Sequence, residues 1–351
     1  MDVRPVAADV LSKAPLSTDV LIVGGGPAGS AAAIACAVNG LKVVLCEREA
    51  FPRERPGEAL HPGVDSLLAQ LGVGDRLDAV TGARFEGVEL DWAGQRRFEP
   101  FGADDDGPWR GRQVRRADFD ALLLDRAREV GCDVLQPCGA LEPTLEGGRV
   151  VGATTDEGPI ACRLLIDASG PARWLPRKLR LPTSERSPAL VVRYGYVSGD
   201  CPAHDAAPAL HGDETGWTWI ARVAERRFQW VRLELSGVDR PRDWLPDTLA
   251  GLSPDAPARG AEMGWRMTQA AGPGWMLAGD TAAMLDPTSS HGVLKALMSG
   301  YFSGQTSTAI LRGGDEAQGL AAYRGWLEGW FANDIQALRA MYGQLGARWA
   351  I

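Results

Sequence analysis

The chain has 351 residues, which is enough for two compact domains of ordinary size. Apolar residues make up 45% of it and charged residues 23%, as in an average globular protein. Its 37 Lys and Arg against 45 Asp and Glu give a formal net charge of −8. This balance argues against a nucleic-acid-binding protein, because such proteins present a strongly basic face.

Residues 1–18 lack a basic start followed by an apolar stretch, so we expect a polar tail and no secretory signal. The apolar run 31–38 is too short to span a bilayer, so we expect no contact with a membrane. The six cysteines form no CxxC pair, which favours free thiols and a cytoplasmic protein. The four histidines lack ligand spacing, so no metal site is predicted.

The first half of the chain has the pattern of a βαβ unit. Residues 19–23 and 41–46 are apolar runs, typical of strands that are buried on both faces of a parallel sheet, and residues 27–39 between them predict a helix. Further helices are predicted at 63–71 and 117–130, followed by short strands at 134–141, 149–155 and 160–166.

The pattern changes between residues 188 and 235, where period-2 alternation indicates antiparallel strands at 189–197, 217–223 and 228–235. We therefore expect a second, smaller domain over residues 172–270, built on an antiparallel β-sheet. A strand at 275–278 then returns the chain to the first domain, which we assign to residues 19–171 and 271–351, and helices are predicted at 292–312 and 316–349.

The strongest motif is Gly24-x-Gly26-x-x-Gly29, which joins the first strand to the first helix. In a GxGxxG turn the first glycine makes the turn, the second lets the backbone approach a pyrophosphate, and the third lets helix and strand pack closely. Pro27 and Ala28 open the helix whose amides would hold the phosphates. Glu47 ends the second strand, where a carboxylate accepts hydrogen bonds from a ribose diol. The motif predicts an α/β, Rossmann-like dinucleotide-binding domain and leaves NAD and FAD open.

A distant segment favours FAD. Residues 275–280 form a strand that ends in Gly279-Asp280, and residues 286–292 lead into a helix. These segments resemble the second FAD signature of the p-hydroxybenzoate hydroxylase-like flavoproteins. The resemblance implies that Asp280 binds the ribityl chain and that the loop and helix start lie against the isoalloxazine, where a helix N-terminus stabilises negative charge. The other residues implied at this place are Gly279, Pro287, Ser290, Gly292 and Val293.

Three more segments resemble the same family. Residues 112–120 are similar to its V-x-R-x-x-F/L-D helix entry, which implies that Gln113 and Arg116 face the cofactor. Residues 165–173 are similar to its D-A-S/D-G strand end. Residues 51–62 resemble the stretch after Glu-Arg, which implies that Arg48 and Arg55 lie at the cofactor and that Arg55 reaches the flavin or the pyrophosphate.

Residues 57–62, 216–219 and 286–290 are similar to flavin-dependent halogenases. They also resemble flavoprotein hydroxylases that act on a tryptophan of a partner polypeptide while cysteine tryptophylquinone is made, and the run 286–300 looks closest to that group. The halogenase resemblance implies a lysine in the first domain that hands on hypohalous acid. The chain has no lysine between Lys42 and Lys178, so we expect hydroxylation ahead of halogenation.

The resemblance thus implies an FAD-dependent monooxygenase that hydroxylates an electron-rich aromatic ring through a flavin C4a-hydroperoxide. The substrate is an aromatic small molecule or a tryptophan or tyrosine side chain of a peptide or carrier-bound protein partner. No second GxGxxG is present, so NAD(P)H must bind transiently or a separate flavin reductase must supply electrons. The alternatives are a flavin-dependent halogenase, a geranylgeranyl reductase-like reductase or dehydrogenase, and a flavoprotein that only binds a maturing partner.

Two histidines are candidate catalytic residues. His291 lies in the loop implied to meet the flavin, and His61 lies in the segment after Glu-Arg; an imidazole can move protons near neutral pH. His204 and His211 lie in loop-like surroundings and are expected at the surface. Four tryptophans of the second domain are candidates for the wall of an aromatic-binding cavity, namely Trp217, Trp219, Trp230 and Trp244.

Overall fold

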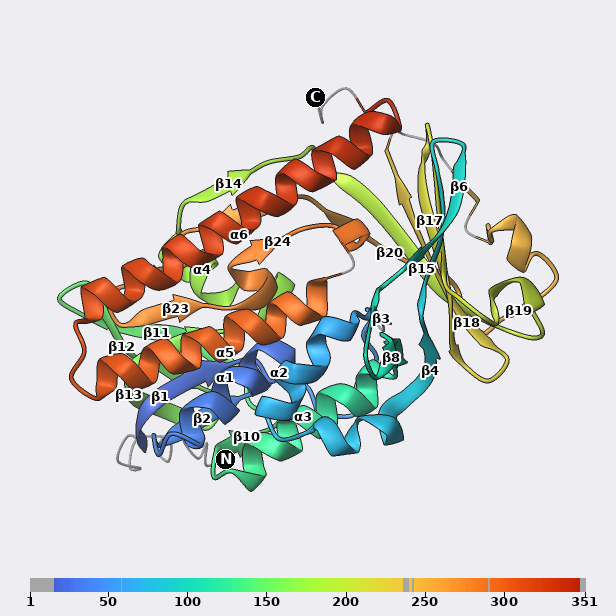
Figure 1. The fold of residues 1–351 in the computed structure, drawn as a ribbon. Helices are drawn as coiled ribbons and strands as arrows, with labels where there is room; N and C mark the ends of the chain where they lie inside the picture. The colour runs from blue at the N-terminus through green and yellow to red at the C-terminus, as the bar shows by residue number, and fades with distance from the viewer. Residues whose placement is uncertain (1–15, 58, 236–239, 242, 290, 348–351) are drawn as a thin grey trace, which may run out of the picture.

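The computed structural model describes residues 16–57, 59–235, 240–241, 243–289 and 291–347 (Figure 1). It contains a mainly parallel sheet flanked by helices and a second, mainly antiparallel sheet. The predicted fold class is confirmed: a Rossmann-like α/β domain is joined to a smaller sheet-based region.

The first sheet is centred on β1 (Leu16–Val23), which pairs in parallel with β2 (Val43–Cys46) and with β13 (Gly158–Asp167). Its remaining strands are β10 (Asp133–Leu135), β11 (Ala140–Glu146), β12 (Arg149–Thr155), β22 (Ala271–Gly272) and β23 (Trp275–Leu277). The strand order is β10-β2-β1-β13-β12-β11, and β23 pairs in parallel with β13. The late strand β23 therefore completes a sheet that the N-terminal segment began, as the sequence predicted.

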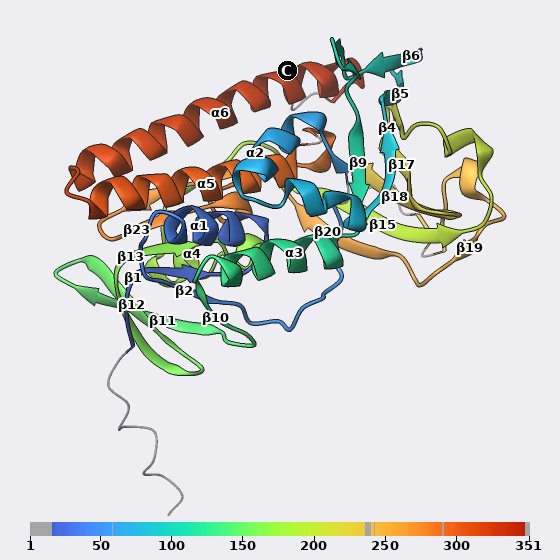
Figure 2. The same cartoon turned by 60° about the horizontal axis from the view of Figure 1, so that its bottom comes forward.

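Helix α1 (Pro27–Ala37) packs against this sheet, and α5 (Gly292–Leu311) packs on α1. The two helices approach closely because glycines of α5 face α1: a Cβ added to Gly300 would lie 2.0 Å from the Ala28 carbonyl oxygen. Helix α6 (Glu316–Gln344) runs across α5 and on towards the second sheet (Figures 1 and 2). The other α-helices are α2 (Asp65–Gln70), α3 (Arg116–Glu129) and α4 (Trp174–Leu179).

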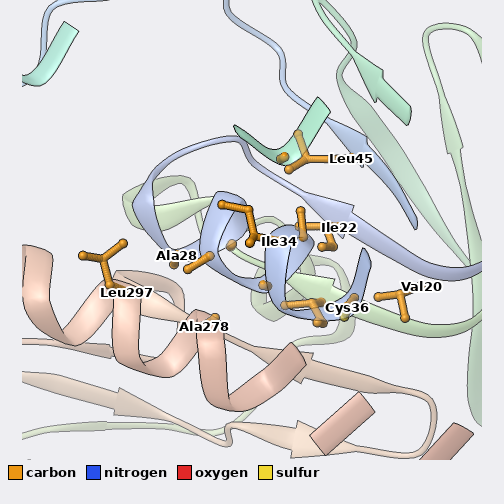
Figure 3. Close-up of a cluster of buried hydrophobic side chains, with 14 of the residues drawn as sticks. Val20, Ile22, Ala28, Ile34, Cys36, Leu45, Ala278 and Leu297 are labelled. Carbon is orange, nitrogen blue, oxygen red and sulfur yellow. The ribbon is translucent and has the colours of Figure 1, made fainter. Parts of the chain in front are cut away.

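The main core lies between these layers. Figure 3 shows Val20 and Ile22 of β1 beside Ile34 and Cys36 of α1, all at most 1% exposed. Leu297 of α5 joins them from the C-terminal part of the chain. This burial on both faces explains why β1 and β2 have no period-2 alternation.

The second sheet has the order β19-β15-β18-β17-β16-β5-β6, with β20 also paired to β15. Its strands are β5 (Gly87–Trp92), β6 (Gln95–Pro100), β15 (Leu190–Ser198), β16 (Ala209–Asp213), β17 (Gly216–Ala224), β18 (Arg227–Glu234), β19 (Ser253–Pro254) and β20 (Arg259–Met263). All pairs are antiparallel except β5 with β16.

The second sheet differs from the predicted domain division in one respect. Strands β5 and β6 belong to it although they lie within 19–171, the range assigned to the first domain. Their hairpin crosses over because β5 pairs with β16 from the backbone of Ala209 to that of Gly212. The remaining boundaries, 172–270 and 271–351, stay predictions.

Short elements connect the two large sheets. The small sheets contain β3 (Ala59–Leu60), β4 (Thr81–Phe85) and β9 (Gly111–Val114); β14 (Thr183–Glu185), β21 (Arg266–Thr268) and β24 (Ala283–Met284); and β7 (Ala103–Asp104) with β8 (Gly107–Pro108). The 3-10 turns are η1 (Pro62–Val64), η2 (Gly74–Val80), η3 (Gly170–Ala172), η4 (Pro202–His204), η5 (Asp247–Leu249), η6 (Gly279–Thr281) and η7 (Pro287–Ser289). Within the described ranges, no helix is long and apolar enough to cross a membrane.

Candidate cofactor and active site

The glycine turn between β1 and α1 has the geometry that its sequence predicts. Gly24 has φ +103°, and a Cβ there would lie 2.5 Å from the Ala168 carbonyl oxygen. A Cβ on Gly29 would lie 1.8 Å from the Gly24 carbonyl oxygen, so only glycine fits either position. Gly26 faces open space apart from Arg53, whose Nη2 lies 3.5 Å from the Cβ position. Since no side chain caps α1, its first amides are available to an anion.

Glu47 fixes the edge of this turn. Its side chain is buried, its Oε2 accepts a hydrogen bond of 2.7 Å from the Gly25 amide, and its Oε1 accepts one of 2.8 Å from the Glu49 amide. A carboxylate oxygen can accept more than one hydrogen bond, so both oxygens retain acceptor capacity for a ribose diol. The placement of Glu47 is compatible with binding of a ribose, and this role stays a prediction.

The arginines of this region are placed differently from one another. Arg53 lies beside the turn, 3.8 Å from carboxylate oxygens of both Glu47 and Asp120, and burial lowers the pKa of its guanidinium. The side chain of Arg55 is 41% exposed and pairs with a neighbouring glutamate, and that of Arg48 is 62% exposed. Arg55 and Arg48 were predicted from the sequence and Arg53 was not, because spacing alone cannot rank arginines within one irregular segment.

Gln113 and Arg116 lie where β9 leads into α3. The Gln113 side chain is buried, and among the described residues neither its amide nitrogen nor its amide oxygen has a hydrogen-bond partner. Arg116 pairs with Asp120 at 2.8 and 3.0 Å and donates to the Pro56 carbonyl oxygen at 2.9 Å. An unpaired buried amide is costly, so Gln113 indicates a polar ligand group beside β9.

The second predicted cofactor segment starts at η6. Gly279 has φ +62°, and burial raises the pKa of the Asp280 carboxyl while Arg116 opposes the rise. Among the described residues, no side chain caps helix α5 at Gly292, and a Cβ on Gly292 would meet no atom within 4 Å. Val293 is buried behind this open helix end. The described part of the chain thus leaves the N-terminus of α5, like that of α1, without a side-chain cap.

The other two residues predicted in this loop cannot both be placed. Pro287 is exposed at the start of η7. Ser290 lies outside the described residues, so its part in a cofactor site stays a prediction.

The two open helix ends are offset along parallel helices. Ala28 of α1 is level with Gly300 of α5, and Ala32 is level with Gly304 (Figure 2 shows the helices side by side). Pro27, the first residue of α1, is therefore level with position 299, seven residues after Gly292, so the α5 N-terminus projects about 10 Å beyond that of α1. This offset lets one extended ligand place a pyrophosphate at the first helix and a distant ring system at the second.

The loop from Asp286 to η7 is tied to the second sheet by a buried network. Asp286 accepts hydrogen bonds from the Trp265 indole and, at 2.8 Å, from the Thr288 amide. The hydroxyl groups of Thr288 and Tyr342 lie 2.9 Å apart, and the Trp217 indole donates to Tyr342 at 2.8 Å. The sequence analysis missed Trp265 and Tyr342, because only tertiary packing brings them to the loop.

The two candidate histidines are brought together. The rings of His61 and His291 lie 5.4 Å apart between centroids, and the Phe101 ring lies 5.1 Å from His61. Burial lowers the pKa of His61, and burial with nearby Lys295 lowers the pKa of His291 to about 4. His61 Nδ1 accepts a hydrogen bond from the Gly63 amide, which leaves Nε2 to carry its proton. Both rings are therefore neutral at pH 7.

The four tryptophans expected to form one wall of an aromatic-binding cavity lie on two different faces of the second sheet. Trp217 and Trp219 alternate with Thr218 and so share one face of β17, whereas Trp230 pairs opposite Ile220 and lies on the other face. There it packs with Trp244 at 5.6 Å between ring centroids. Trp217 and Trp219 alone remain on the face turned to the network of Tyr342.

The expectation that His204 and His211 lie in a surface loop is wrong for His204, which is 5% exposed and contacts the Thr248 hydroxyl at 3.1 Å. His211 is half-buried within β16. The two rings pack 6.4 Å apart between centroids, which the polar sequence around them did not indicate. In the part of the chain that the structure describes, no three His, Cys, Asp or Glu side chains form a group able to hold a metal ion.

The residues present fit FAD. The described residues provide two helix N-termini without a side-chain cap, the Gly26 cradle and the buried Gln113 amide. Each supplies what one part of the cofactor needs: donors for phosphate, an amide for a polar ring edge, and a helix dipole for a charged ring.

Comparison with known proteins agrees with this geometry. Residues 19–109 match the family model for tryptophan halogenase. The chain is 28% identical over 343 residues to a 1H-pyrrole-2-carbonyl-[peptidyl-carrier protein] brominase from Pseudoalteromonas luteoviolacea (strain 2ta16), covering 89% of this chain and 82% of that one. It is 29% identical over 353 residues to a tryptophan 2-halogenase from Chondromyces crocatus, covering 90% of this chain and 66% of the relative.

A similar structure is that of the myxobacterial chondrochloren halogenase CndH, described as an FAD-dependent halogenase. It superposes with a TM-score of 0.84 at 25% identity and covers 93% of this chain and 83% of the other. The chain is an FAD-dependent oxidoreductase, and it is similar in sequence and in fold to flavin-dependent halogenases.

Proposed function

We propose that this protein uses FAD to place an electrophilic substituent on an electron-rich aromatic ring, with the flavin lying between the α5 N-terminus and the His61–His291 pair. The supporting observation is the offset of two parallel helix N-termini that no described side chain caps, about 10 Å apart along the helix axis. When bound, FAD supplies the oxidising power from molecular oxygen.

The protein's own residues bind, orient and accept a proton. The α1 N-terminus and Arg53 hold the pyrophosphate, and Gln113 and Asp280 hold the polyol and ring edge. Substitution on an aromatic ring releases the proton of the replaced C–H bond. The neutral imidazole of His291 or of His61 can accept that proton, because each is unprotonated at pH 7.

Halogenation is the first candidate reaction. The named activities of two relatives, a carrier-bound pyrrole brominase and a tryptophan 2-halogenase, support it. The substrate would then be an indole, pyrrole or phenol, either free or attached to a carrier protein. This reverses the order of the two chemistries that the sequence alone favoured.

Hydroxylation is the second candidate, and the lysine pattern favours it. No lysine lies between Lys42 and Lys178. Lys42 is exposed just before β2, and Lys178 pairs with Glu142 near the surface. Neither faces the histidine pair. The resemblance of residues 286–300 to hydroxylases of cysteine tryptophylquinone maturation supports a tryptophan of a partner polypeptide as the substrate in this case.

Product analysis separates the candidates. Purified protein is mixed with FAD, NADH and a separate flavin reductase, and is given tryptophan, a tryptophan-containing peptide or carrier-bound pyrrole-2-carboxylate, with and without bromide. A bromine isotope pattern that requires bromide supports halogenation, and a gain of about 16 Da per oxygen atom that ignores bromide supports hydroxylation. Turnover without oxygen would instead indicate a reductase, and a protein that stays colourless after addition of FAD would refute every flavin-based function.

A further inference from the structure

One lysine lies inside the site region. Lys295 belongs to the first turn of α5, three residues after Gly292, and its side chain is 11% exposed. Its Nζ pairs with a carboxylate oxygen of Asp334 on α6 and lies 4.2 Å from the centroid of the Trp330 ring. An ammonium that is buried, paired and set over an indole face is held in one place rather than free to move in solvent.

This lysine borders a cavity that also touches the proposed cofactor site. The cavity has a volume of about 30 Å³ and lies between η6, the first turns of α5 and the middle of α6. Its lining includes Asp280 and Gly292 as well as Lys295 and Trp330. Lys295 therefore borders the same small cavity as Asp280 and Gly292, the residues assigned to the ribityl chain and the ring.

The charged and titratable groups around Lys295 are few. Asp334 faces it from α6, Asp280 from η6 across the cavity, and buried Asp286 from the preceding loop. His291 also lies beside it, and that ring is neutral at pH 7. Burial lowers the pKa of Lys295 to about 7, while Asp286 opposes the fall, so the ammonium form predominates below neutral pH.

We propose that Lys295, held by Asp334, is a positioning residue that places a positive charge beside the flavin and so strengthens the binding of reduced FAD relative to oxidised FAD. This inference rests on the proposed function, since it requires FAD to occupy the site. Reduced FAD carries more negative charge on its ring than oxidised FAD. A cation across a low-dielectric cavity stabilises the reduced form, and the negative charge of Asp334 partly offsets that effect.

The test measures dissociation constants for oxidised FAD in air and for reduced FAD under anaerobic dithionite, at pH 6. In Lys295→Met, reduced FAD should lose about tenfold in affinity relative to oxidised FAD, because a charge is removed at short range. Asp334→Asn should shift the ratio about threefold in the opposite direction, because an opposing charge is removed. Lys295→Arg should retain a ratio within about twofold of the parent value.

The direction in which Asp334→Asn changes the ratio of the two dissociation constants distinguishes an electrostatic role of the ion pair from a purely structural one. If the pair only held α5 against α6, breaking it from either side would weaken both forms of FAD alike. Lys178→Met, which breaks the surface pair with Glu142, is the matched control and should change nothing. If Lys295→Met and Asp334→Asn change the affinity for reduced FAD relative to oxidised FAD equally and in the same direction, or if neither changes it, the inference is overturned. Failure of the parent protein to bind FAD at all would instead refute the proposed function.

Discussion

Replacing Tyr342 by phenylalanine tests the coupling between the flavin loop and the second sheet. The Tyr342 hydroxyl lies 2.9 Å from that of Thr288 and accepts the Trp217 indole N–H at 2.8 Å. It also lies close to the Asp286 carboxylate, and burial together with this negative charge raises the pKa of the phenol well above its usual value. The substitution removes one oxygen atom and leaves the ring in place.

The loss in free energy of unfolding follows from the two polar groups that lose a hydrogen-bond partner. The Trp217 side chain is 1% exposed, so its N–H loses its acceptor without gaining water, which costs about 1–3 kcal/mol. The Thr288 hydroxyl loses one partner, which adds about 0.5–1.5 kcal/mol. Tyr342→Phe should therefore lower the free energy of unfolding by about 1.5–4.5 kcal/mol.

Urea denaturation of four proteins measures this cost: the parent, Tyr342→Phe, Trp217→Phe and the double variant. The double variant removes the orphaned donor together with its acceptor, so its loss should be smaller than the sum of the single losses by about 1–2 kcal/mol. A Tyr342→Phe cost below about 0.5 kcal/mol, or strictly additive losses, would show that the hydroxyl does not hold the loop to the sheet.

Three further outcomes follow from the structure. Gly300→Ala places a Cβ 2.0 Å from the Ala28 carbonyl oxygen and should cost about 3 kcal/mol or more in chemical denaturation, whereas Gly325→Ala, at an open position on α6, should stabilise by about 0.5–1 kcal/mol. Gln113→Leu should stabilise the FAD-free protein, because it removes an unpaired buried amide, yet weaken FAD binding at least severalfold in a fluorescence titration. The folded-state pKa of His291, about 4, lies below its unfolded value. The neutral ring therefore contributes fully to the free energy of unfolding above about pH 6.5, and this contribution is lost as the pH falls towards 4. The urea midpoint should fall less over that pH range in His291→Gln than in the parent protein.

Buried apolar runs and the glycine turn motif predicted the strands and the turn of the first domain. The buried runs at 19–23 and 41–46 became neighbouring parallel strands, and the turn at Gly24 has the positive φ that its role requires. Such features depend on short-range sterics and burial, which a single sequence records directly. The strand at 275–278 that returns to the first sheet was also predicted, in a segment that resembles the second FAD signature of a known flavoprotein family.

Features that depend on long-range pairing could not be predicted. The hairpin β5–β6 joined the second sheet because β5 pairs with β16, more than a hundred residues away, and nothing in either strand specifies that partner. The polar residues around His204 indicated a loop, yet the ring is buried beneath the sheet. Arg53 and Arg55 differ by two positions in one irregular segment, and only tertiary structure places Arg53 beside Gly26.

The same long-range contacts determine what the site can do. The loop that leads into the α5 N-terminus is fixed through Asp286 to Trp265 and through Thr288 to Tyr342. Tyr342 in turn binds Trp217 of the second sheet, the sheet on which we expect the substrate to lie. A displacement of that sheet is therefore expected to act on the helix end at which we propose that the ring system of FAD lies. Because this link is a chain of buried hydrogen bonds rather than loose apolar contact, substrate and cofactor positions are coupled through defined atoms, and single-atom deletions can test the coupling.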